Sequence, residues 1–282
     1  MRIALLTLES LANARAVRRF VAAHAGEIVL VGLSDPYRPQ TGGMTGQTWR
    51  HLKRSGPRIL PYLFLSFTLP GLVEAVRSRR PGDVDRTPLW AACEARGLPV
   101  ETVRDVNGPV FRERLDAARP DLILSFHFDQ ILAADTIAAA PLGGINVHAG
   151  LLPRHRGPVP TIHALLDRPV ALGVSIHRLV PQIDAGALLV QAAMPDQLDL
   201  TAIAAAAALH EAALPLLDRL LPEIAAGRAV ETPLPLLPYR PFPTAAELAC
   251  LARSGRSAAG WRDLRAALGM QADGCRVGRH IV

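Results

Sequence analysis

The sequence predicts an α/β protein built on a mostly parallel β-sheet with helices on its faces. Short apolar runs alternate along the chain with longer segments of helical period, the order expected of parallel strands joined by crossover helices. Half of the 282 residues are hydrophobic and only 20% are charged, so the chain has ample apolar side chains for a sizeable core. This composition excludes long disordered and collagen-like chains.

The alternation begins at the first residue and continues to about residue 226. Residues 1–6 and 28–33 are apolar runs that predict strands, and the alanine- and arginine-rich segment between them predicts a helix. Further strands are predicted at residues 98–103, 122–126, 145–148, 174–179 and 187–191, and further helices at 88–96, 109–118, 133–140, 161–166 and 200–226. Pro215 favours a kink in the last helix.

The loop after the first predicted strand has the sequence TLESLANAR (residues 7–15). It lacks the GxGxxG pattern that lets a backbone approach a dinucleotide pyrophosphate. The sequence therefore argues against binding of NAD or FAD.

The cysteines and the N-terminal residues indicate the cellular compartment of the protein. Cys93, Cys250 and Cys275 are widely spaced and form no CxxC pair, which disfavours a disulfide scaffold and a cysteine zinc site. No close grouping of His, Asp and Glu replaces them, so we expect no metal. Glu9 interrupts the first apolar run, so we expect no secretory signal and a cytoplasmic location.

The positive charge is almost wholly arginine, because Lys53 is the only lysine, and the formal net charge is +6. The arginines are scattered apart from local groups at residues 50–54, 77–80 and 154–156. A nucleic-acid-binding surface would require a continuous basic stripe, and base stacking would require more aromatic residues than the 5% present. We expect no nucleic-acid partner.

Residues 35–86 interrupt the regular alternation. A Gly- and Thr-rich loop (41–47) and a basic patch (51–54) lead into the uncharged segment 59–73. That segment is shorter than the roughly 20 residues that span a bilayer. It favours a buried helix pair or a contact in a homodimer. The alternative is an interfacial element that touches a membrane surface or a lipid-linked substrate.

Polar side chains with catalytic chemistry follow the strand at 145–148. Asn146 and His148 are two residues apart, so their side chains point to the same face of a strand. Asp184 lies further on, in the turn-like sequence QIDAG just before the next predicted strand. A carboxylate near an imidazole can orient the ring and raise its pKa.

This pattern resembles the folate-dependent formyltransferase family. The resemblance rests on Asn146-x-His148, the loop LLPRHRG (151–157), and Asp184-x-Gly186 starting 36 residues after His148. It extends over about residues 120–191. It implies a formyltransferase-type Rossmann-like catalytic domain at residues 1–228, carrying the 35–86 insertion, and a short Pro- and Arg-rich C-terminal extension at 229–282.

The same resemblance implies a donor, 10-formyltetrahydrofolate, and a catalytic set of Asn146, His148 and Asp184. Asn146 and a protonated His148 would donate hydrogen bonds to the developing oxyanion, and Asp184 would hold the imidazolium. The segment DLILSFHFDQIL (121–132) resembles the strand and loop that bind the pterin through backbone groups. The residues implied in cofactor binding are Phe126, His127, Phe128, Gln130, Ile131, Leu132 and Gly186.

The acceptor amine is less defined by the resemblance. The sequences IHRLVPQIDAGALLVQ (176–191) and YRPFPT (239–244) are similar to those of amino-sugar N-formyltransferases. Arg154, His155 and Arg156 would then contact the phosphates of a nucleotide carrier, although Arg156 is equally suited to brace its own loop. Methionyl-tRNA and glycinamide ribonucleotide are disfavoured, because the segment after Asp184 is short for an RNA-binding barrel and the first loop lacks a Gly- and Ser-rich phosphate site.

Two alternatives stay open. One is formylation of another small or lipid-linked amine, with peripheral membrane contact through residues 59–73. The other is a non-catalytic folate-binding or membrane-associated accessory protein that retains the fold.

Overall fold

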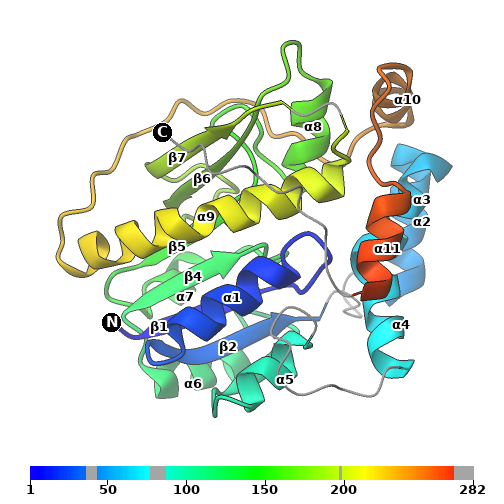
Figure 1. The fold of residues 1–282 in the computed structure, drawn as a ribbon. Helices are drawn as coiled ribbons and strands as arrows, with labels where there is room; N and C mark the ends of the chain where they lie inside the picture. The colour runs from blue at the N-terminus through cyan, green and yellow to red at the C-terminus, as the bar shows by residue number, and fades with distance from the viewer. Residues whose placement is uncertain (36–42, 77–86, 197–198, 270–282) are drawn as a thin grey trace.

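The computed structural model describes residues 1–35, 43–76, 87–196 and 199–269. Within these ranges a seven-stranded sheet has the order β3-β2-β1-β4-β5-β6-β7 (Figure 1). The first five strands in this order are parallel, and β6 and β7 are antiparallel to their neighbours. The strands are β1 (Ile3–Thr7), β2 (Ile28–Ser34), β3 (Val100–Val103), β4 (Leu122–Phe126), β5 (Gly144–His148), β6 (Leu172–Arg178) and β7 (Leu188–Met194). The predicted α/β class with a mostly parallel sheet is confirmed.

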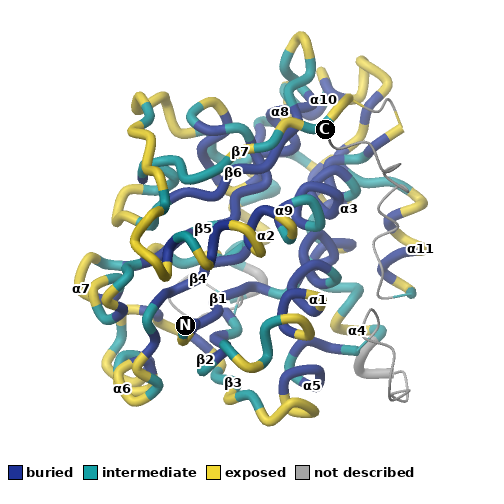
Figure 2. The backbone as a smooth tube through the Cα atoms, turned by 60° about the vertical axis from the view of Figure 1, so that its left-hand side comes forward, coloured by how far each residue is buried: buried dark blue, intermediate teal, exposed yellow. Residues whose placement is uncertain are grey.

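Helices cover both faces of the sheet. On one face the core includes residues of α1 (Ala14–His24), α5 (Leu89–Glu94), α8 (Pro160–Leu166) and α9 (Ala202–Ala225). On the other face it includes residues of α6 (Pro109–Ala118), with α7 (Ala134–Ile137) packed against it. Successive strand residues alternate between the two faces: Ile3 and Leu5 contact the first core, Ala4 and Leu6 the second. In Figure 2 the central strands are buried, whereas the edge strands β3 and β7 are mostly intermediate.

Several elements differ from the sequence prediction in their bounds or in their course. Only Ala134–Ile137 is helical in the segment predicted as helix 133–140. Strand β7 continues to Met194 because it pairs with β6 along its length, with Leu172 opposite Met194. Helix α9 runs as one element through both Pro215 and Pro222.

The insertion forms a series of short helices that pack against the C-terminal segment. Its elements are α2 (Gly43–Ser55), a 3-10 turn η2 (Pro57–Ile59), α3 (Leu60–Leu63), a π-helical turn η3 (Phe64–Thr68) and α4 (Leu69–Val76). They contact α10 (Ala245–Arg253) and α11 (Trp261–Gly269), as Figure 1 shows at the right of the sheet. Arg54 Nε and Ser55 Oγ donate hydrogen bonds to the carbonyls of Phe242 and Pro243. The two segments predicted to lie outside the regular core therefore meet each other.

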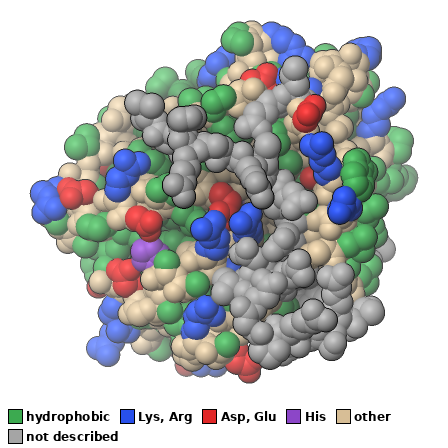
Figure 3. Space-filling view, in the orientation of Figure 1, with side chains coloured by type: hydrophobic (Ala, Val, Ile, Leu, Met, Phe, Trp, Pro, Cys, Tyr) green, Lys and Arg blue, Asp and Glu red, His purple; other side chains and the backbone are tan. Residues whose placement is uncertain are grey.

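The apolar segment 59–73 is partly buried. Ile59, Tyr62 and Leu65 lie in the core, whereas Phe64 and Leu72 are exposed. None of the helices in the described ranges is both long and apolar enough to span a bilayer. The arginine group at 77–80 falls outside those ranges. On the face drawn in Figure 3, basic side chains are interspersed with acidic ones.

A polar network holds the loop between β1 and α1. The Asn13 amide donates to the Thr7 hydroxyl and the Leu8 carbonyl, which ties the helix start to the strand end. The fully buried Arg18 side chain forms an ion pair with Glu9, with 2.9 Å between Nη1 and Oε1. Glu9 also accepts a hydrogen bond from the Leu89 amide at the start of α5. The Glu9 carboxylate therefore links this loop both to Arg18 of α1 and to the start of α5.

We expect the Glu9→Gln variant to lower the free energy of unfolding by about 3 kcal/mol, because it removes the carboxylate charge beside the buried Arg18 guanidinium. Urea unfolding measures this change. Glu101→Gln is the control, since Glu101 pairs with Arg114 on the surface and such pairs contribute less than about 1 kcal/mol. Equal losses in the two variants would contradict this account of the loop.

Candidate active site

The candidate site lies at the carboxyl ends of β4 and β5. Residues 127–132 follow β4, and Asn146 and His148 lie at the end of β5. The strand order changes direction between β1 and β4, and open parallel sheets bind ligands beside such a switch point. Two adjoining cavities occupy this position, one of about 480 Å³ and one of about 970 Å³.

His148 and Asp184 approach each other in the smaller cavity, with 3.6 Å between Nδ1 and Oδ1. Nε2 of His148 lies 2.8 Å from the His155 carbonyl oxygen. Because a carbonyl only accepts hydrogen bonds, Nε2 carries a proton, and Nδ1 is the unprotonated nitrogen of the neutral ring. Burial lowers the pKa of His148 below 6.5, although the Asp184 carboxylate opposes this shift. His148 is therefore neutral at pH 7 and can accept a proton at Nδ1.

Asp184 remains charged. Its backbone has a φ of 48°, and its Oδ2 accepts a hydrogen bond of 2.8 Å from the Gly157 amide. Burial alone would raise the pKa of Asp184, but the His148 and His177 rings and the Gly157 amide outweigh burial and lower it to about 2. The carboxylate is thus placed to stabilise positive charge on His148 once that ring takes up a proton.

His177 joins this group from the neighbouring strand β6. It lies opposite Asn146 in the antiparallel pairing of β5 with β6. Its Nδ1 lies 2.8 Å from the Arg178 carbonyl and therefore carries a proton. Its Nε2 lies 3.1 Å from Asn146 Nδ2 and 3.5 Å from Asp184 Oδ1. In the neutral ring, Nε2 accepts a hydrogen bond from the Asn146 amide and so orients it.

Two further histidines line the cavity wall. His127 has a φ of 57°, and its ring centroid lies 5.5 Å from that of His210 on α9. Burial lowers the pKa values of His127 and His210 to about 4 and about 3. Both are therefore neutral at pH 7 and offer hydrogen bonds rather than charge. His210 reaches the wall because α9 packs against the sheet, a contact that the sequence pattern alone does not show.

The residues expected to bind the donor fall into two groups. His127, Phe128, Gln130, Ile131 and Leu132 line the smaller cavity. Gln130 also holds its own loop, since its amide donates to the Val103 carbonyl and accepts from the Val106 amide.

Phe126 and Gly186 are not among the residues that line the smaller cavity, contrary to expectation. Phe126 is fully buried in the core, and its carbonyl accepts a hydrogen bond from the Thr7 hydroxyl. Gly186 permits close packing, since a Cβ there would lie 1.9 Å from the Arg178 carbonyl oxygen. Both residues therefore shape the site without facing it.

The sequence predicted that Arg154, His155 and Arg156 contact substrate phosphates. The structure contradicts this prediction for His155 and Arg156, which are buried. His155 is fully buried, with its Nε2 2.7 Å from Asp167 Oδ2. Arg156 is also buried, and its guanidinium donates to the carbonyls of Ile183, Asp184 and Leu237. Arg156 thus braces the loops around Asp184, which was the alternative reading. Arg154 is exposed but lines neither of the two cavities.

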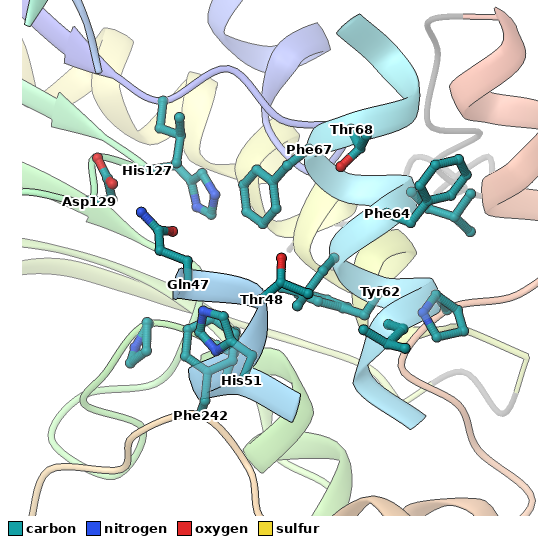
Figure 4. Close-up of a pocket in the computed structure, with 18 of the residues that line it drawn as sticks. Gln47, Thr48, His51, Tyr62, Phe64, Phe67, Thr68, His127, Asp129 and Phe242 are labelled. Carbon is teal, nitrogen blue, oxygen red and sulfur yellow. The ribbon is translucent and has the colours of Figure 1, made fainter. Parts of the chain in front are cut away.

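The larger cavity has apolar walls and adjoins the smaller one (Figure 4). Tyr62, His127, Phe128 and Phe242 line both cavities. Figure 4 shows the Phe67 ring beside His127, and Phe242 beside His51. In the portions of the chain that are described, no three His, Cys, Asp or Glu side chains converge as metal ligands would.

Comparisons with known proteins bear on the family and the fold. The family model described as formyl transferase matches residues 92–220, which include Asn146, His148 and Asp184. Residues 92–220 thus match the formyl transferase family, and the fold is the Rossmann-like formyltransferase fold expected from the sequence.

Solved structures of similar fold share little sequence with the chain. A sugar N-formyltransferase from Shewanella is 16% identical with a TM-score of 0.52, and the match covers 86% of this chain and 76% of that one. WlaRD, a sugar 3N-formyltransferase solved in the presence of dTDP and 5-N-formyltetrahydrofolate, is 14% identical with a TM-score of 0.53, covering 86% and 69%. Glycinamide ribonucleotide transformylase 1 from Symbiobacterium toebii is 17% identical with a TM-score of 0.52, covering 83% and 94%.

Replacing Gly157 by Ala should displace Asp184. A Cβ at Gly157 would lie 2.0 Å from the Arg240 carbonyl oxygen, and the backbone φ of 131° disfavours a side chain. We expect formyl transfer to fall by about tenfold or more, as for loss of a positioned catalytic group. The control is Gly227→Ala, because Gly227 also has a positive φ but lies in open space. Unchanged kcat in a folded Gly157→Ala variant would contradict the positioning role of this amide.

The pH dependence of activity should report His148. In the wild type, kcat/KM should fall as the pH is lowered through the His148 pKa, below 6.5, because the ring must be neutral to accept a proton. Asp184→Asn removes the charge that raises this pKa, so the acid limb should move to lower pH while the maximal rate drops. Steady-state rates between pH 4.5 and 8 measure both effects, and a limb that moves to higher pH would oppose the assignment.

Proposed function

We propose that the chain transfers the formyl group of 10-formyltetrahydrofolate to the primary amine of an amino sugar. The observation that carries this proposal is the neutral His148 beside the charged Asp184 and the oriented Asn146 amide, all at one end of the smaller cavity. The sugar N-formyltransferases of similar fold support the acceptor class, and the formyltetrahydrofolate named with WlaRD supports the donor.

The smaller cavity suits the donor. Its volume of about 480 Å³ lies within the usual range for small-molecule sites. Residues 127–132 form one wall, and the loop that carries Leu179, Val180 and Ile183 forms another. The apolar side chains of Leu179, Val180 and Ile183 suit a flat, uncharged ring system held close to Asp184. The pterin is the part of the donor with this character.

In the proposed reaction the amine nitrogen attacks the formyl carbon, and a C–N bond forms. The Asn146 amide has one N–H engaged by His177, and its second N–H can donate to the oxygen that becomes negative. His148 accepts the amine proton at Nδ1, and Asp184 stabilises the resulting imidazolium.

Cleavage of the bond between the formyl carbon and the folate nitrogen completes the transfer. The proton held by His148 passes to that nitrogen as the bond breaks. The products are the formamide and tetrahydrofolate, and His148 returns to its neutral state. This route needs no covalent enzyme intermediate.

A direct test incubates the protein with 10-formyltetrahydrofolate and one acceptor at a time, namely an amino sugar, free or nucleotide-linked, glycinamide ribonucleotide or methionyl-tRNA, and follows tetrahydrofolate release by absorbance. We expect release that depends on an amino sugar and falls by about a hundredfold or more in His148→Ala, as for loss of a general base. His24→Ala is the control, since His24 lies on α1 outside both cavities. Undetectable donor binding would contradict the proposal.

The accessory-protein alternative makes a different prediction. It requires folate binding without turnover and predicts the same behaviour in wild type and His148→Ala. The charged Asp184 beside an unprotonated His148 nitrogen favours the enzyme, because a binding protein has no use for a proton acceptor at this position.

A further inference from the structure

We infer that the acceptor amine is attached to an apolar group of lipid-like character, and that this group occupies the larger cavity. The inference rests on the proposed formyl transfer, and it replaces the nucleotide carrier expected from the sequence. Three observations support it: the composition of the cavity walls, the wall residues that the two cavities share, and the origin of the walls.

The walls are predominantly aromatic and aliphatic. Those side chains include Leu60, Tyr62, Leu63, Phe64, Leu65, Phe67, Phe128, Val159, Phe242, Trp261 and Leu264. Among the described residues that line either cavity there is no Lys or Arg. Diphosphates are commonly held by such cations, most often by the two-pronged guanidinium of arginine.

The ionisable groups in the walls also disfavour a phosphate. Burial and the neighbouring Arg50 lower the pKa of His51, so this ring is neutral at pH 7. The Asp129 carboxylate contributes a charge of the same sign as a phosphate. An apolar group needs no cation in the walls and is not repelled by the Asp129 carboxylate.

The two cavities adjoin each other, and Tyr62, His127, Phe128 and Phe242 line both. An amine beside His148 can therefore extend a long substituent past His127 into the larger space. At about 970 Å³ that space lies near the upper end of the range for small-molecule sites. It is larger than a sugar amine alone would need.

The walls come from the two segments outside the regular α/β core. The insertion supplies Gln47, Thr48, His51, residues 60–65, Phe67 and Thr68, and the C-terminal segment supplies Phe242, Ala259, Gly260, Trp261 and Leu264. These segments contact each other through α11 with α4 and η3. The parts of the chain that depart from the regular alternation thus build the space for the substituent of the acceptor.

The test uses primary n-alkylamines from butylamine to decylamine, below their critical micelle concentrations, and measures Kd by isothermal titration calorimetry. Each added methylene should tighten binding about threefold to fourfold until the cavity is filled. UDP-glucosamine serves as the nucleotide-linked comparison and should bind more weakly than decylamine. Affinity that is independent of chain length, or tighter binding of UDP-glucosamine, would overturn the inference.

Matched variants locate the binding. Leu264 and Leu268 lie one turn apart on α11 and are 41% and 43% exposed, but only Leu264 is a lining residue. Leu264→Asp should weaken decylamine binding at least about tenfold, as expected when a charge replaces apolar contact area. Leu268→Asp should not change it. Phe64→Asp, at a lining residue that is 44% exposed, should repeat the Leu264→Asp result. Equal losses in Leu264→Asp and Leu268→Asp would overturn the assignment to this cavity.

A second readout separates this inference from the proposed function. Formylation of the bound decylamine is followed by mass spectrometry with 10-formyltetrahydrofolate present. Chain-length-dependent binding without formylation of any amine would contradict the proposed function and leave the apolar site standing. Formylation of UDP-glucosamine alone, with no binding of alkylamines, would overturn the inference and uphold the function.

Discussion

The site is organised around the buried carboxylate of Asp184. Three groups hold it: the Gly157 amide, the His148 ring and the His177 ring. Arg156 in turn fixes the loop that carries Asp184 through the carbonyls of Ile183 and Asp184. A buried charge is costly unless it is surrounded by such partners, so the LLPRHRG loop and the turn at Asp184 depend on each other for their positions.

This arrangement sets the order of proton movement. Because burial lowers the pKa of His148 and Nε2 is engaged by the His155 carbonyl, the resting ring has an unprotonated Nδ1. The sequence suggested a protonated His148 as an oxyanion donor from the start. The structure instead favours a base at rest that becomes a cation during the reaction, when Asp184 can stabilise it. The depressed pKa of Asp184, about 2, keeps that carboxylate charged throughout.

How much the sequence could predict depended on whether local pattern or tertiary contact decided each feature. The buried strands at 122–126 and 145–148 were predictable because short, mostly apolar runs of this length are typical of buried strands. Asn146 and His148 could be placed on one face from strand geometry, and the family pattern linked them to Asp184. His177 could not be found in this way, because its position depends on the antiparallel pairing of β5 with β6. The larger cavity could not be predicted from the sequence either, because it forms only where the insertion meets Phe242 and α11.

The most direct test of the account follows the reacting carbon itself. The donor is supplied with a carbon-13 formyl group, and rapid-quench samples are analysed by NMR under single-turnover conditions with an accepted amine. We expect the label to appear in the formamide in the wild type, and we expect this appearance to be lost in His148→Asn while donor binding is retained. Label released as free formate in the wild type, or transferred at an unchanged rate by His148→Asn, would contradict the central claim that His148 and Asp184 carry out formyl transfer.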